Sequence, residues 1–249
     1  MSRLLPPAFG VLCIVALLCL LQLAIQAGIV DVYIVPLPTD MLASLPRLVE
    51  EEHVIRRFGV TFGETLSAGL LALVVGVALG MALQHWPRMR RAFEPWFALL
   101  AAAPLVMAYP LFLVLFGRSS LTIIVIAFAS ALAPVVLKTI EGFATIRPVL
   151  IDVGHSLRMT RAQEFRLILL PAALPEIFVG LRLALIFALI NVVGVEFLIN
   201  LGGLGQLISE LSERYDLPGT WASIGLVVIV SILFFLLLDG GERWLRKRH

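Results

Sequence analysis

Lysine, histidine and cysteine are scarce in this sequence, and each scarcity argues against a class of site. There are only two lysines, Lys138 and Lys247, and neither follows a glycine-rich loop, so we expect no phosphate-cradling ATPase site in this chain. Four histidines lie in four separate segments without metal-ligand spacing, and no serine, histidine and acid grouping indicates a nucleophile. Both cysteines, Cys13 and Cys19, lie in one apolar run, which argues against a disulfide framework or a metal site. An enzyme is therefore disfavoured, and any ATP hydrolysis must come from another protein.

Charge is scarce as well. Charged residues make up 14% of the 249 residues, whereas globular domains have about 25%. Hydrophobic residues make up 60%, whereas globular domains have about 45–50%. The mean hydropathy is +1.02, so the chain should fold in a lipid bilayer as one domain over residues 1–249. A net charge of +2 is too small to indicate nucleic acid as a partner.

Long apolar stretches predict an all-α polytopic membrane protein with six transmembrane helices. A helix needs about 20 apolar residues to cross the hydrocarbon core. The first stretch is longer than a signal-peptide core and lacks a clean cleavage site, so we expect it to span the membrane. The expected spans cover residues 9–27, 61–83, 96–116, 121–140, 174–199 and 221–238.

The arginines and lysines of the connections predict the orientation. Thirteen of the nineteen fall on the side that holds both termini and five on the other, so both termini should be cytoplasmic. Arg182, early in the fifth span, can reach the same cytoplasmic side. The thirteen are Arg3, Arg88, Arg90, Arg91, Lys138, Arg147, Arg158, Arg161, Arg166, Arg243, Arg246, Lys247 and Arg248; the five are Arg47, Arg56, Arg57, Arg118 and Arg214.

Prolines and glycines within the spans suggest how the helices are shaped and packed. Pro104 and Pro110 lie in the third span and should bend it, and bent helices often line cavities. Small residues in the second span form a face suited to close helix contact, for which packing is a better interpretation than substrate binding. These residues are Gly69, Ala72, Gly76 and Gly80.

A polar, arginine-rich segment over residues 143–173 interrupts the apolar sequence on the predicted cytoplasmic side. Ile146, Leu150, Val153 and Leu157 recur at helical spacing and predict a short amphipathic helix. Thr160 with Gln163 has the spacing of a capping box, which predicts that a second short helix starts there at an angle. Two short helices with a bend can fill a cleft on a partner.

This segment resembles the cytoplasmic loop of permease subunits of bacterial ABC importers, in the branch that handles nitrate, sulfonate, taurine and related solutes. The family pattern is E-A-A-x-S-L-G-A-S, followed by L-P-x-A-L-P and G-L-R-L-A-L. Residues 152–160 read DVGHSLRMT, residues 170–175 read LPAALP, and residues 180–185 read GLRLAL. The likeness extends over residues 35–249. Asp152 replaces the usual Glu, Gly154 the second Ala, and Arg158 a Gly that gives the loop freedom to turn. Arg158 must therefore adopt an ordinary backbone conformation or be held in a strained one.

The resemblance implies a permease subunit of the bacterial plasma (inner) membrane that imports a small polar or anionic solute. Two copies of the chain would pair as a homodimer, surrounded by membrane lipid, with ABC ATP-binding subunits and a periplasmic or lipid-anchored solute-binding protein. ATP and Mg would be bound by the partner subunit, with no cofactor in this chain. The residues implied in coupling to the ATPase are Asp152, Val153, Gly154, Ser156, Leu157, Arg158, Met159, Thr160, Arg161, Gln163 and Phe165.

For the translocation pathway we expect lining by Met107, Tyr109, Asn191 and Glu196. An alternative for Glu196 is an interfacial residue that is hydrogen-bonded to the bundle. The centres of the spans hold almost no charge, which disfavours an ion-coupled carrier. An ATP-independent channel or scaffold, whose inner loop serves as an anchor, is the alternative function, and an integral-membrane enzyme is a third.

Overall fold

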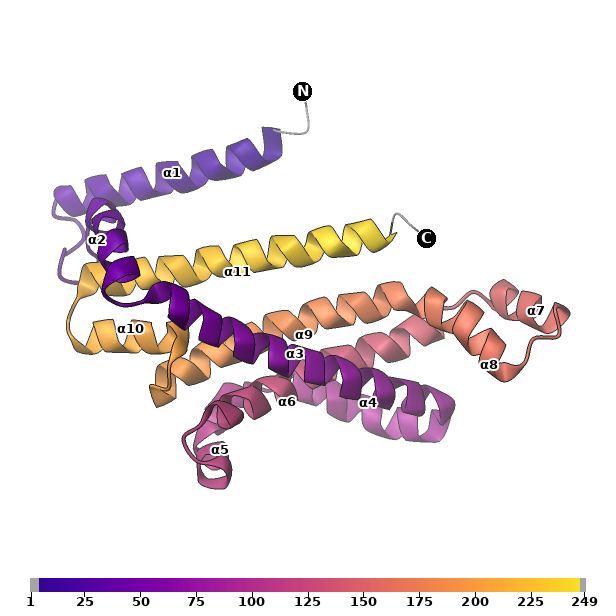
Figure 1. Ribbon diagram of the computed structural model, residues 1–249. Coiled ribbons are helices and arrows are strands. Elements are labelled where there is room, and N and C mark those ends of the chain that lie inside the picture. The colour runs from indigo at the N-terminus through magenta and orange to yellow at the C-terminus, as the bar shows by residue number, and fades with distance from the viewer. Residues whose placement is uncertain (1–4, 247–249) are drawn as a thin grey trace.

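The described part of the chain consists of helices and short connections, without a strand (Figure 1). The computed structural model describes residues 5–246, and of residues 5–9, 11 and 241–246 it describes only the backbone. The α-helices are α1 (Leu5–Gln26), α2 (Pro38–Glu50), α3 (Val54–His85), α4 (Pro87–Ala102), α5 (Tyr109–Phe116), α6 (Ser120–Ala144), α7 (Pro148–Ser156), α8 (Arg161–Glu164), α9 (Leu170–Ile199), α10 (Gly203–Glu213) and α11 (Leu217–Arg246), with a 3₁₀ turn η1 (Leu105–Ala108) and a π-helical turn η2 (Phe165–Leu169).

Four helical stretches are long and apolar enough to cross a membrane: α3, α6, the stretch Arg161–Glu213 that contains α9, and α11 as far as Gly240. A fifth crossing results if α4 and the η1–α5 segment count as one span. The first predicted span corresponds to α1, whose described apolar part runs from Leu12 to Gln26. The count of six crossings stays a prediction. So does the side of the termini, since Arg3, Lys247 and Arg248 lie outside the described residues.

The predicted third span is a broken helix. Its two halves meet at an angle of 85°, at Ala103 and Pro104, where the backbone of Ala103 is extended. Pro110 lies in the first turn of α5, where a missing N–H leaves no hydrogen bond unmade. The bend expected at Pro104 is therefore confirmed, whereas Pro110 starts a helix and does not bend one.

The core of the molecule is a bundle of α3, α6 and α9 (Figure 1). The predicted small-residue face of α3 is buried in it and packs as expected. A methyl group added to Gly76 would lie 2.7 Å from Cβ of Val135, and one added to Gly80 would lie 2.6 Å from Cβ of Thr139. The backbone of α3 therefore touches the side chains of α6 directly, which fixes the spacing of the two helices.

A smaller cluster packs at the end of the bundle away from α7 and α8, where α2 and α10 meet the starts of α3 and α11. Ion pairs reinforce it: Arg57 lies 2.7 Å from Glu210 and Arg214 lies 2.7 Å from Glu52. Arg47 pairs with Asp216. These contacts join helices that are distant in sequence into one assembly at the predicted outer face.

Candidate functional site

The predicted cytoplasmic loop lies at the opposite end of the bundle as two short helices, α7 and α8 (Figure 1). Pro148 begins α7 at a position that suits proline, and α8 continues through the π-helical turn η2 into α9. The bent pair of short helices that the sequence predicts is therefore present, and it joins α6 to α9.

Helix α7 is followed, two residues after its last residue, by the left-handed residue Arg158, with a φ of 50°. The N–H of Arg158 donates to the carbonyl of His155 at 3.0 Å, and that of Met159 to the carbonyl of Gly154 at 3.1 Å. This pair of bonds is a Schellman motif, in which the left-handed position usually holds glycine. Arg158 thus has a backbone conformation that glycine adopts more readily than a residue with a β-carbon.

The capping box at the start of α8 is confirmed. The N–H of Gln163 donates to Oγ1 of Thr160 at 3.4 Å, and the N–H of Thr160 donates to Oε1 of Gln163 at 2.9 Å. Together with the Schellman motif, these bonds satisfy the backbone on both sides of the bend. The angle between the two short helices is therefore set by local hydrogen bonds.

Two contacts attach the loop to the bundle. Gly154 is buried against η2, and a methyl group there would lie 2.9 Å from Cδ1 of Ile168. The rings of Phe143 and Phe165 stack with centroids 6.1 Å apart, which joins the end of α6 to η2. Because these contacts are close, the loop should move with α6 and α9 and not independently of them.

The expected apolar stripe of α7 divides into two faces. Ile146 and Leu150 turn inward and line a hollow with residues of η2 and α9. Val153 and Leu157 remain 46% and 63% exposed, and Val149 on the same side is exposed as well. The tip of the loop therefore presents apolar side chains that no described residue covers.

The other predicted loop residues lie around this tip. Asp152, Ser156 and Arg158 are exposed, and Met159 is half-buried. Thr160, Arg161 and Gln163 are exposed on the second helix and Phe165 is half-buried. Only Gly154 faces the interior, where it allows close packing. The structure thus brings the predicted coupling residues together on one end of the molecule.

The four predicted pathway residues do not share a cavity within one chain. Met107, in η1, is 73% exposed, and Tyr109, at the start of α5, is half-buried. Asn191 is buried, where its Nδ2 donates to Oγ of Ser130 at 2.8 Å and ties α9 to α6. A role in lining the pathway stays a prediction for all four.

Glu196 is fully buried at the junction of α3, α9 and α10. Its carboxylate accepts hydrogen bonds from Oγ1 of Thr61 at 2.8 Å and from the N–H of Gly205 at 2.9 Å. Oγ1 of Thr61 in turn accepts from the N–H of Leu204 at 2.9 Å. Glu64, which is also buried, lies beside Glu196. Sequence reasoning missed the part that Thr61 and Glu64 have in this network, and a buried polar residue in an apolar span was the available signal.

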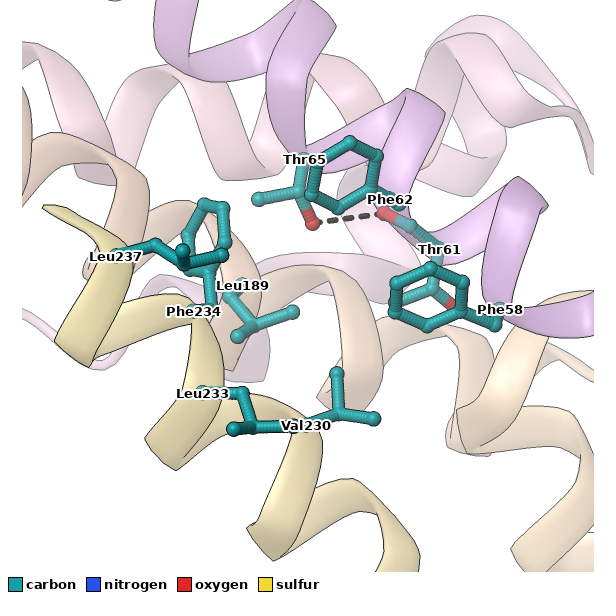
Figure 2. Close-up of a pocket in the computed structure, with 9 residues that line it drawn as sticks. All are labelled: Phe58, Thr61, Phe62, Thr65, Leu189, Val230, Leu233, Phe234 and Leu237. Atoms are coloured by element: carbon teal, nitrogen blue, oxygen red, sulfur yellow. Dashed lines mark hydrogen bonds between the residues drawn. The ribbon is translucent and has the colours of Figure 1, made fainter.

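A groove between α3, α9 and α11 is almost entirely apolar (Figure 2). Phe58 and Phe62 face Phe234 across it, and the hydroxyl of Thr65 donates to the carbonyl of Thr61 at 2.7 Å. Both threonine hydroxyls thus donate their protons within the protein, Thr65 to the backbone of α3 and Thr61 to Glu196, so neither has a proton left to donate to a solute. The groove suits hydrocarbon and does not suit a polar substrate.

Comparison with known proteins gives a family match over residues 72–249, to the family described as binding-protein-dependent transport system inner membrane component. The taurine transport system permease protein TauC of Escherichia coli (strain K12) is 29% identical over 72% of the chain, which spans 65% of that relative's length. The bicarbonate transport system permease protein CmpB of Synechocystis sp. is 27% identical over 98% of the chain and 88% of its own length. The putative aliphatic sulfonates transport permease protein SsuC of Bacillus subtilis is 23% identical over 90% of the chain and 81% of its own length.

Solved structures share the fold. A chain of the MetNI methionine ABC transporter in an inward-facing conformation superposes with a TM-score of 0.67 at 21% identity, and covers 77% of this chain and 95% of its own. A chain of an amino acid ABC transporter with histidines superposes with a TM-score of 0.64 at 19% identity. The match covers 80% of the present chain and 97% of the transporter chain.

Proposed function

We propose, because the chain belongs to the family of binding-protein-dependent transport system inner membrane components, that it is the permease subunit of an ATP-driven importer. The family is one of multi-pass inner-membrane transport proteins and not of enzymes, so the energy must enter through a partner. Two copies of the chain would form the pathway, and a solute-binding protein would deliver the solute at the outer face.

The exposed apolar tip of α7 is the observation that carries this proposal. An amphipathic helix whose apolar residues are left uncovered is suited to a groove on another protein. Val153 and Leu157 supply that surface, and the contacts of Gly154 and Phe165 connect it to α6 and α9. ATP-driven closure of the partner would therefore move two core helices as rigid bodies.

The solute class is supported by the relatives. TauC and SsuC are named for taurine and aliphatic sulfonates and CmpB for bicarbonate, which are small polar or anionic solutes. We therefore infer a solute of this kind for the present chain. Met107 and Tyr109 are the assigned pathway residues with exposed surface, whereas the contacts of Asn191 and Glu196 favour a bracing role.

The proposal is tested by replacing the apolar tip with charge. In the double variant Leu157→Asp and Met159→Asp, the ATP-binding subunit should no longer copurify in mild detergent, and ATP-driven uptake into proteoliposomes should fall to background. The control is Ala162→Asp, which adds one negative charge, half of the charge of the double variant, at an exposed position early in α8. Uptake that survives the double variant, or a wild type that retains no ATPase, would favour the ATP-independent channel or scaffold.

A further inference from the structure

A polar hollow opens on the outer face beside the loop that joins α5 to α6. Its volume is about 530 Å³, and it is lined by Tyr109, Leu113, Arg118, Leu198, Ile199 and Asn200. Arg118 is the only cation among these residues, and none of them is acidic. The hollow lies at the end of the bundle opposite to α7 and α8, where a solute would enter.

Arg118 is held in position without being neutralised. Its Nε donates to the carbonyl of Ile199 at 2.8 Å and its Nη2 donates to the carbonyl of Asn200 at 2.5 Å, at the C-terminal end of α9. No carboxylate of the described residues forms an ion pair with it. Of the other outer arginines, Arg47, Arg57 and Arg214 pair with acids, whereas Arg56 forms no ion pair with a described residue.

The remaining N–H groups of Arg118 are available to a ligand. A guanidinium is always charged, and its planar set of donors matches the oxygens of a sulfonate or a carboxylate. Tyr109, whose hydroxyl forms no hydrogen bond with the described residues, adds a second donor on the wall of the hollow. Leu113 and Leu198 add apolar surface for a short hydrocarbon group.

We propose that this hollow binds the anionic head of a small organic solute at the outer mouth of the pathway, with Arg118 as the residue that selects for negative charge. The proposal rests on the proposed function for its place in import, although binding can be measured separately. Anionic solutes and lipid phosphate groups share this chemistry, and a solute is the ligand assigned here.

Ethanesulfonate is a suitable probe, and saturation-transfer NMR can measure its binding to the full-length chain in phosphatidylcholine nanodiscs. The wild type should bind ethanesulfonate saturably and should not bind choline. Arg118→Gln should weaken binding tenfold or more, because a charge-assisted hydrogen bond contributes about 1.5–3 kcal/mol. Glutamine keeps N–H donors for the carbonyls of α9, so a role in capping alone would leave binding unchanged.

The matched control is Arg56→Gln, which removes another exposed outer arginine without a carboxylate partner among the described residues. This variant should bind like the wild type. Absent wild-type binding, or equal binding by Arg118→Gln, would overturn the proposal. Loss of binding when phosphatidylglycerol is added to the nanodiscs would also overturn it and would assign the hollow to a lipid headgroup.

The same preparation separates this site from the proposed function. If no ATP-binding subunit copurifies but ethanesulfonate binding depends on Arg118, the importer assignment fails and the site stands. If the subunit copurifies and binding is independent of Arg118, the site fails and the importer assignment stands.

Discussion

Single residues at the tip of the loop formed by α7 and α8 are held in place by hydrogen bonds on both sides of the bend. Arg158 has a left-handed backbone that a β-carbon disfavours. The two Schellman hydrogen bonds, donated by the N–H groups of Arg158 and Met159, tie the bend to the end of α7. The capping box of Thr160 and Gln163 ties it to the start of α8. The surrounding bonds therefore determine the conformation, and the side chain at position 158 only makes it less stable.

Arg158→Gly should stabilise this bend. Removing the β-carbon from a left-handed residue should raise the free energy of local opening by about 1 kcal/mol. Hydrogen exchange of the Arg158 and Met159 amides should slow about fivefold, since exchange from a locally opened state follows that free energy. Arg158→Ala keeps the β-carbon and should show no slowing; equal protection in both variants would mean that the arginine side chain, and not backbone strain, weakens the bend.

Local features of the site could be predicted from the sequence, and contacts across the chain could not. Thr160 and Gln163 are three residues apart, so their capping box follows from spacing alone. One hydrogen-bond partner of Glu196 is Thr61, which lies 135 residues away, and only the packing of α3 against α9 brings the two together. For that reason the sequence left both roles of Glu196 open.

At the scale of helices, small residues decide how closely α3 approaches α6 and α9. The spacing of Gly69, Gly76 and Gly80 predicted this face correctly, because one stripe of a helix must face one neighbour. The break between α4 and α5 was less accessible to prediction. Proline can either bend a helix or begin one, and the sequence does not distinguish Pro104 from Pro110.

Gly76→Ala should destabilise the bundle. The added methyl group would lie 2.7 Å from Cβ of Val135, so α3 and α6 would have to separate, and overpacking of this kind costs about 1–3 kcal/mol. The expected result is a lower melting temperature of the detergent-solubilised chain. Gly63→Ala is the control in the same helix, because nothing lies within 4 Å of its added methyl group. If both variants melted alike, α3 and α6 would not be in contact at this position.

The whole molecule carries its charge differently at its two ends. Around the loop, Arg147, Arg158, Arg161 and Arg166 are exposed and form no ion pair with the described residues. At the other end, Arg47, Arg57 and Arg214 are paired with acids, and Arg56 and Arg118 are not. More unpaired arginines therefore lie at the loop end, which is the pattern typical of a cytoplasmic face. The composition and the apolar stretches predicted a helical membrane protein, but not how α1 and α11 sit beside the core, and the orientation stays a prediction.

The orientation can be measured with single cysteines in a chain whose Cys13 and Cys19 have been replaced by alanine. Leu157→Cys lies at the exposed tip of the loop, and Tyr215→Cys replaces a side chain that is 88% exposed beside α10. A membrane-impermeant maleimide should label Tyr215→Cys in intact spheroplasts and Leu157→Cys in inverted vesicles, because the excess of arginine predicts that the loop lies inside the cell. The cysteine-free chain controls for background labelling. Labelling of Leu157→Cys in intact spheroplasts would place the loop outside, where no ATP-binding subunit could reach it.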